Sequence, residues 1–218
     1  MISPFLSQFF SIALIALLGA MLPGPDFAIV TKNTIFHSRQ SGCVTALGVG
    51  TAVAVHMTYC VLGLAVVISS SLLIFSLIKY IGACYLIYLG INSLFSKQSK
   101  EIFSPSADRL GNTGIQKTKI SNLVSFKQGF LCNLLNPKAT LFFLSLFTVV
   151  IKPSTPFHWE LVYALEILVT SVTWFCTLTI ILSHPRIKKA LDKAGKYIAK
   201  FLGVFLIGFG VALAFLKR

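Results

Sequence analysis

Apolar residues run along the chain in blocks, each followed by a short polar or basic stretch. A helix needs about 20 mainly apolar residues to cross the hydrocarbon core of a bilayer, and most of the blocks reach that length. On this basis the predicted spans are about 5–25 with a continuation to 37, 43–66, 70–95, 126–151, 158–183 and 198–216. The pattern therefore predicts an all-α membrane protein with six transmembrane helices.

The composition agrees with this prediction and excludes most soluble classes. The 218 residues are 56% hydrophobic, and the mean hydropathy is +0.84. Nineteen basic and six acidic residues give a formal net charge of +13, which would suit nucleic acid if the basic residues shared one polar face. They lie instead between the apolar blocks, so no nucleic-acid partner is expected.

The basic residues also predict the orientation, because cytoplasmic loops of membrane proteins carry an excess of Lys and Arg. The predicted loops on one side of the membrane carry Lys32, Arg39, Lys97, Lys100, Arg109, Lys117, Lys119, Lys127, Arg186, Lys188, Lys189, Lys193, Lys196 and Lys200. The other side carries Lys152, Lys217 and Arg218. We therefore expect the basic loops in the cytoplasm and both termini in the periplasm of a bacterial inner-membrane protein.

The N-terminal block leaves one question of topology open. It begins without Lys or Arg, so a five-span variant or a cleaved signal peptide remains an alternative, although we favour a retained helix. Loop 96–125 is polar and contains Pro and Gly, which indicates a flexible cytoplasmic linker. Segment 184–201 would be amphipathic as a helix, and it fits either an interfacial helix on anionic lipid headgroups or an ordinary basic loop.

The stretch CNLLNPKATLFF (132–143) places three unusual residues inside a predicted span. Pro137 cannot donate to the helix ladder, and Lys138 costs roughly 2.5–3.5 kcal/mol near mid-bilayer on insertion scales. Asn136 can bond locally and stabilise a break in the helix. The carbonyls released near Asn133 must face protein or a water-filled cavity.

A weak internal repeat gives this break a counterpart. GAMLPGPDFAIV (19–30) parallels CNLLNPKATLFF, and the segment 81–97 aligns with 202–217, which superposes Gly90 on Gly210 and Lys97 on Lys217. Each unit contains three spans, so consecutive copies would cross the membrane in opposite senses. We therefore expect one transporter domain over 1–218, built from two inverted three-helix repeats (about 5–95 and 126–216), with helices 1 and 4 broken at Pro.

The two breaks would bring opposite charges together. The first break, at Pro23, Gly24 and Pro25, lies beside Asp26, and the second carries Lys138. Such a pair suits the α-ammonium and α-carboxylate of an amino acid, with the half-helix ends adding partial charges. Two alternatives stay open: Asp26 could cap the following helix outside the bilayer, and Lys138 could snorkel or pair with Asp26 structurally.

Other intramembrane polar residues also have two interpretations. His56 and Glu166 are candidates for a proton relay, but His56 equally fits a packing role. Lys79 lies near the outer end of its span, where snorkelling is favoured. Gly48 and its small neighbours in small-xxx-small spacing favour close helix contact over lining a path.

Nothing in the sequence suggests an enzyme site, a metal or a cofactor. The cysteines Cys43, Cys60, Cys84, Cys132 and Cys176 sit singly in apolar surroundings. The four histidines form no ligand pair, and no H-E-x-x-H or P-loop pattern occurs. We therefore expect no catalytic residue, no metal ligand and no cofactor.

The sequence resembles the LysE/RhtB family of amino-acid exporters at PGPDF (23–27), YIGACYLIYLGI (80–91) and FKQGFLCNLLNPKATLFF (126–143). The resemblance covers essentially the whole chain, and it implies a small bacterial inner-membrane exporter of amino acids or related metabolites that uses the proton gradient. The family's motif positions fall here on Pro23, Gly24, Pro25, Asp26, Asn136, Pro137 and Lys138. The chain departs from many relatives at TVVIKPSTPF (148–157), which puts the outer end of span four in doubt.

Together these observations predict a secondary efflux transporter that works by alternating access around a midplane site. The alternatives are a non-transporting scaffold or regulatory subunit, which would have no need for intramembrane Pro, Asp and Lys, and an intramembrane enzyme or electron-transfer protein. A small-molecule amino-acid substrate and membrane lipids are the expected partners. The particular substrate, the coupling ion and a homo-oligomeric state are left open.

Overall fold

The computed structural model describes residues 4–70, 72–95, 120–150 and 155–215, and within this part of the chain all regular structure is helical. The helices are α1 (Pro4–Met21), α2 (Pro25–Phe36), α3 (Arg39–Ser70), α4 (Leu72–Phe95), α6 (Asn122–Leu134), α7 (Pro137–Val150), α8 (Phe157–Leu182) and α9 (Pro185–Phe215). The predicted all-α class is confirmed.

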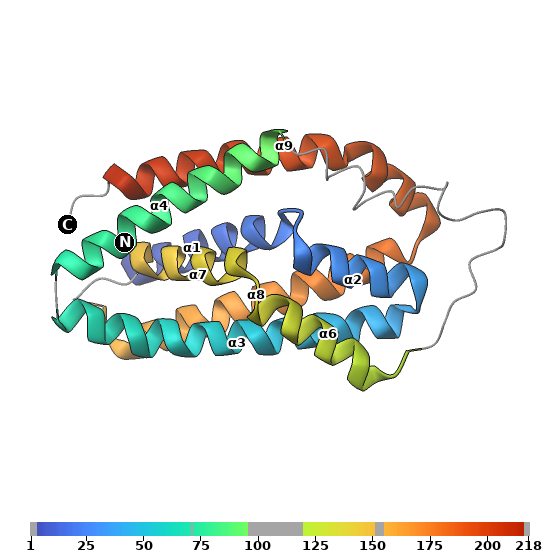
Figure 1. Cartoon of the computed structure of the whole chain (residues 1–218), viewed down its shortest axis with the longest axis horizontal. Helices are drawn as coiled ribbons and strands as arrows, with labels where there is room; N and C mark the ends of the chain where they lie inside the picture. Colours follow the sequence, from blue (N-terminus) through green and yellow to red (C-terminus); the bar gives the residue numbers. More distant parts are fainter. Residues whose placement is uncertain (1–3, 71, 96–119, 151–154, 216–218) are drawn as a thin grey trace.

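The helices lie roughly along one common axis (Figure 1). α1 and α7 occupy one half of the molecule, and α2 and α6 occupy the other half. The long helices α3, α8 and α9 run through both halves, whereas α4 lies mainly in the half of α1 and α7, and α1 begins at the same end at which α9 finishes. Successive passes therefore alternate in direction when each pair of short helices is taken as one pass.

Both predicted helix breaks are confirmed. The axis bends by 63° between α1 and α2 and by 59° between α6 and α7. The second member of each pair begins with a proline, Pro25 or Pro137, whose missing N–H costs nothing at the first helical position. The backbone therefore restarts as a new helix in another direction after each break.

Length and composition support two to four membrane spans among the described residues. The stretches Arg39–Gly63 in α3 and Phe157–Leu182 in α8 are each long and apolar enough alone, and each bent pair passes as one broken span. α4 and α9 contain shorter apolar stretches, at Ala83–Asn92 and Lys200–Val211. The prediction of six spans is therefore supported only in part.

Two helix starts differ from the sequence prediction. α6 begins at Asn122, a few residues before the predicted span, because the Ser121 hydroxyl accepts from the Val124 N–H at 3.2 Å and caps the helix. α9 begins at Pro185, so the basic segment 184–201 is largely helical and continuous with the last apolar stretch. This favours the helical interpretation of that segment over an ordinary loop.

Some predictions fall outside the described residues. These are the linker over 96–119, Lys152, and the superposed pair Lys97 and Lys217. The side chains of Lys79 and of 185–196, on which the snorkelling and headgroup predictions rest, are also not described.

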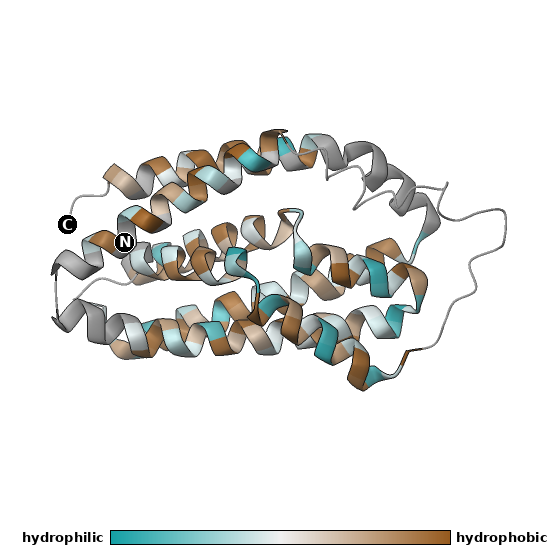
Figure 2. Ribbon diagram, in the orientation of Figure 1, coloured by the Kyte–Doolittle hydropathy of each residue, from teal (hydrophilic) through white to brown (hydrophobic). Residues whose placement is uncertain are grey.

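Large apolar side chains cover the outer surface, while polar ones are buried near the breaks. Phe10, Phe95 and Phe201 each expose more than half of their area, as suits contact with lipid. Figure 2 shows hydrophobic residues along most helices and hydrophilic ones at the starts of α2 and α7. The molecule is thus apolar on its outer surface, and its largely apolar core contains polar side chains at the breaks.

Two glycines make reciprocal contacts between α4 and α9. A β-carbon added at Gly90 would lie 2.5 Å from the Gly203 carbonyl oxygen, and one at Gly210 would lie 2.8 Å from that of Ala83. The same additions would also meet the side chains of Ile207 and Ile87, respectively. Gly48 likewise approaches the backbone of α6, which bears out the close-contact interpretation.

We predict that Gly90→Ala and Gly210→Ala each lower the free energy of unfolding by about 1–3 kcal/mol, because the new methyl groups would collide with backbone. Gly208→Ala on α9 is the matched control, since nothing lies within 4 Å of its added carbon. That variant should be neutral or stabilising, because Ala favours a helix by about 1 kcal/mol over Gly. Thermal unfolding of the purified protein in detergent measures all three, and equal shifts would contradict the packing.

Candidate functional site

The two helix breaks lie side by side and are joined by hydrogen bonds through Asp26. Its Oδ2 atom accepts from Asn133 Nδ2 and from Asn136 Nδ2, each at 3.0 Å. Asp26 stands at the start of α2, and the two asparagines stand at the end of α6 and in the link to α7. The carboxylate therefore ties the first break to the second.

Asn136 serves both breaks at once. Its Oδ1 atom accepts from the backbone N–H of Lys138 at 3.0 Å, which caps the start of α7. The amide group is thereby oriented, so that Nδ2 is free to donate to Asp26. The expected role of Asn136 in stabilising the break is observed.

Lys138 reaches back from the second break to the first. Its Nζ atom donates to the carbonyl oxygens of Leu22 and Pro23, both at 3.3 Å, and not to Asp26. These carbonyls lie between α1 and α2, where no helical N–H serves them. A β-carbon at Gly24 would lie 2.8 Å from Nζ, so glycine is what allows this approach.

His56 supports the second break from α3. Pro137 lacks the N–H that would bond to the Asn133 carbonyl in a continuous helix, and His56 Nε2 lies 3.3 Å from that oxygen. The other ring nitrogen, Nδ1, contacts the Tyr59 hydroxyl. If Nε2 donates to the carbonyl, Nδ1 accepts from Tyr59, and the ring is neutral with both nitrogens occupied. This geometry favours the packing interpretation of His56.

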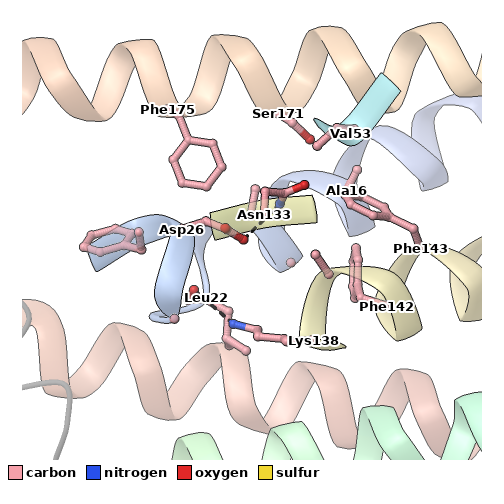
Figure 3. Close-up of a pocket in the computed structure, with 15 residues that line it drawn as sticks. Ala16, Leu22, Asp26, Val53, Asn133, Lys138, Phe142, Phe143, Ser171 and Phe175 are labelled. Atoms are coloured by element: carbon pink, nitrogen blue, oxygen red, sulfur yellow. Dashed lines mark hydrogen bonds between the residues drawn. The ribbon is translucent and has the colours of Figure 1, made fainter. Parts of the chain in front are cut away.

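A small cavity of about 40 Å³ lies between the breaks. Figure 3 shows Asp26, Asn133, Lys138, Phe142, Ser171 and Phe175 among its lining residues. One water needs about 10–15 Å³ of such a cavity, so there is room for a few waters but not for a whole amino acid. The site is therefore too small for a whole substrate in this conformation.

Helix ends set the electrostatic character of the cavity. α2 and α7 both begin at it, and the N-terminus of a helix carries about half a positive charge. Asp26 at the start of α2 therefore lies where a carboxylate is favoured. Gly24 is the N-cap residue of α2, and no side chain caps this helix, so the alternative of Asp26 as a simple cap is not supported.

Glu166 lies apart from the cavity. It is 7% exposed on α8, its carboxyl lies against the backbone of Ala13 of α1, and no side chain among the described residues donates to it. Ser171, five residues further along α8, lines the cavity. Five residues span about 7.5 Å of helix, so Glu166 lies between the cavity and the end at which α8 begins.

The structure brings most predicted site residues together and adds several. Gly24, Asp26 and Lys138 line the cavity, while Pro23, Pro25, Asn136 and Pro137 shape the breaks around it. The additions missed by sequence reasoning are Asn133, Phe142, Ser171 and Phe175. Asn133 had one available signal, since it lies one turn before Asn136. Among the described residues no cluster of His, Cys, Asp or Glu could hold a metal.

Comparison with known proteins gives a consistent result. The model of the LysE type translocator family matches residues 17–217. The uncharacterized membrane protein YrhP of Bacillus subtilis (strain 168) is 33% identical over 200 residues, covering 90% of this chain and 93% of that protein. The threonine efflux protein of Escherichia coli (strain K12) is 30% identical over 210 residues, covering 95% and 98%. No solved structure matches significantly.

We predict that His56→Gln retains most of the protein's stability and transport, because its amide can still donate to the Asn133 carbonyl. His56→Leu should lower the free energy of unfolding by about 0.5–1.5 kcal/mol, since the carbonyl then keeps only its bond from the backbone, at 3.0 Å from the Asn136 N–H. Thermal unfolding and transport assays of both variants test this. Equal loss of transport in both, with stability unchanged, would favour a proton relay instead.

Proposed function

Because the chain belongs to the LysE type translocator family, it is a membrane transporter and not an enzyme, and we propose that it exports amino acids or related small metabolites across the bacterial inner membrane. One observation carries the proposal beyond the family: an acid and a base from two facing helix breaks line one cavity near the middle of the molecule. Asp26 would attract the α-ammonium of an amino acid, and Lys138 its α-carboxylate.

The contacts of Lys138 suggest how binding is linked to movement. In this conformation its ammonium is held by two backbone carbonyls of the first break. A carboxylate is a stronger partner for an ammonium than a neutral carbonyl, because both partners are then charged. A bound substrate would draw Lys138 away from the first break and leave the link between α1 and α2 free to shift. Alternating access around the site fits this exchange.

Several features support six spans in two inverted repeats. The bent pairs run in opposite directions, their bends differ by only a few degrees, and Gly90 and Gly210 make reciprocal contacts. The contact residues also correspond, since Ala83 and Ile87 face one glycine as Gly203 and Ile207 face the other. These are relations that a two-fold pseudosymmetry between the repeats would produce.

The positions of basic residues support the proposed orientation. Lys32 in α2, Arg39 at the start of α3 and Lys127 in α6 all belong to the same half of the molecule. That half would face the cytoplasm, where Lys and Arg are enriched. The half containing α1 and α7 would then face the periplasm, with both termini.

Glu166 is the better of the two proposed proton carriers. Its carboxyl is buried and receives no hydrogen bond from any described side chain, whereas both nitrogens of His56 are engaged. An ionised carboxylate without a partner is costly in such surroundings, so its proton occupancy would respond strongly to conformation. In the proposed orientation it lies on the periplasmic side of the cavity, where protons would enter.

Threonine is the first substrate to assay, because relatives that match nearly the whole chain are named threonine efflux proteins. A scaffold role is the second candidate. The buried charges at the breaks argue against it, since a passive scaffold would carry their insertion cost without use.

We predict that Asp26→Asn and Lys138→Gln each reduce amino-acid export by more than about tenfold, since each removes a charged partner worth about 1.5–3 kcal/mol. Export of labelled threonine and of an amino-acid mixture from loaded proteoliposomes measures the effect. Lys127→Gln, on the exposed side of α6, is the matched control for Lys138. Unchanged export in both site variants would remove their proposed roles.

We predict that Glu166→Gln separates exchange from net transport. The glutamine cannot carry a proton, so net export driven by a proton gradient should fall about tenfold or more while one-for-one substrate exchange continues. Glu160→Gln, a second buried acid near the start of α8, is the control and should keep both activities. Gradient-driven export within about twofold of wild type in Glu166→Gln would exclude the residue as the proton carrier.

A further inference from the structure

Two buried oxygen atoms at the cavity have no hydrogen-bond partner: Asp26 Oδ1 and Asn133 Oδ1. The other polar atom of each group is engaged, because Asn133 Nδ2 donates to Asp26 Oδ2 at 3.0 Å. Asn133 is only 2% exposed, and both residues line the cavity. Within the part of the chain that the structure describes, these two acceptors therefore lack a well-formed hydrogen bond, with the Cys132 side chain beside Asp26 and the His56 ring beside Asn133.

We propose that these two oxygens form the subsite for the primary ammonium group of the substrate. This inference rests on the proposed function, and it deepens that function in two ways. It adds Asn133 as a binding residue, and it assigns the amino end of the substrate to the cavity side of Asp26.

The orientation of the Asn133 amide carries the argument. Because Nδ2 donates to Asp26, Oδ1 is the atom left to face a ligand, and an amide oxygen can only accept. A primary ammonium has three N–H donors and no acceptor, which complements a site that offers only acceptors. The Ser171 hydroxyl lines the same cavity and supplies an acceptor for a third N–H.

The distances allowed by the covalent groups agree with one shared ligand. A tetrahedral ammonium with N–H···O distances of about 2.9 Å bridges acceptors about 5 Å apart. Asn133 Nδ2 and Asp26 Oδ2 are joined by a hydrogen bond of 3.0 Å. The free Oδ1 atoms belong to the same amide and the same carboxylate as these two atoms. This hydrogen bond keeps the two groups next to each other, which a shared ammonium requires.

The cavity has the size of a head group rather than of a whole substrate. About 40 Å³ accommodates an ammonium and its attached carbon, while the carboxylate and side chain need the site to widen. Its walls are largely apolar, with Phe142 and Phe175 among them, and such surroundings of low dielectric strengthen a charge-assisted hydrogen bond. The carboxylate end is then directed toward Lys138.

The test compares three ligands that share a hydroxyl but differ in their charged groups. L-Threonine carries both groups, 1-amino-2-propanol lacks the carboxylate, and 3-hydroxybutyrate lacks the ammonium. Dissociation constants come from ligand-dependent thermal shifts of the purified full-length protein in detergent. Asn133→Leu should weaken threonine and 1-amino-2-propanol about tenfold or more, and change 3-hydroxybutyrate by less than about twofold.

Asn33→Leu is the matched control. Asn33 is also a buried asparagine with an unpartnered Oδ1 atom, and it donates to Thr45 and Gln128 two turns along α2 from Asp26, away from the cavity lining. Its substitution should leave the relative affinities for the three ligands unchanged. If Asn133→Leu does not fold, Asn133→Ser replaces it, because the short hydroxyl can donate to Asp26 but does not extend into the cavity.

Three results would overturn the inference. One is a wild-type protein that binds threonine no better than 3-hydroxybutyrate. Another is an Asn133 variant that loses affinity for all three ligands equally. The third is a thermal shift of the protein with sodium chloride but with no amine. If 1-amino-2-propanol needs Asn133 while no amino acid is exported, the proposed function fails and the ammonium subsite stands.

Discussion

The structure depends on the mutual satisfaction of two interrupted helices. Each break releases backbone groups that neither water nor lipid can serve inside a membrane. The carbonyls of the first break accept from Lys138 of the second, and the Asn133 carbonyl of the second lies against His56. Asp26 completes the arrangement by accepting from Asn133 and Asn136. Without the other, neither break would have partners for its polar groups in such apolar surroundings.

This arrangement explains why so much polarity is tolerated at the centre of an apolar molecule. Nearly every polar group at the breaks forms a hydrogen bond within the protein. The few groups without one are therefore candidates for contact with a ligand. Asp26 Oδ1 and Asn133 Oδ1 are left without donors at the one place where a cavity adjoins both breaks. In the proposed site, one atom of each side chain would hold the breaks together and the other would bind the ligand.

The breaks themselves were readable from the sequence, because Pro25 and Pro137 act locally and their consequences do not depend on distant residues. The internal repeat predicted that Asp26 and Lys138 would lie close to each other. Other features were not predictable, because they arise from contacts between helices far apart in the chain. These are the carbonyl partners of Lys138, the contact of His56 with the Asn133 carbonyl, and the position of Ser171 in the cavity wall. The Ser121 cap that starts α6 early is a local signal that the apolar pattern had obscured.

The carbonyl contacts of Lys138 also bear on what the unloaded carrier can do. A transporter whose empty site leaves bare charges at mid-membrane is trapped on one side until cargo neutralises them. Here the lysine has its own backbone partners and the aspartate has its asparagines, so the empty site is internally compensated. Under the proposed alternating access, such a carrier would be able to return unloaded. A return without cargo is what distinguishes net efflux from obligatory exchange of one solute for another.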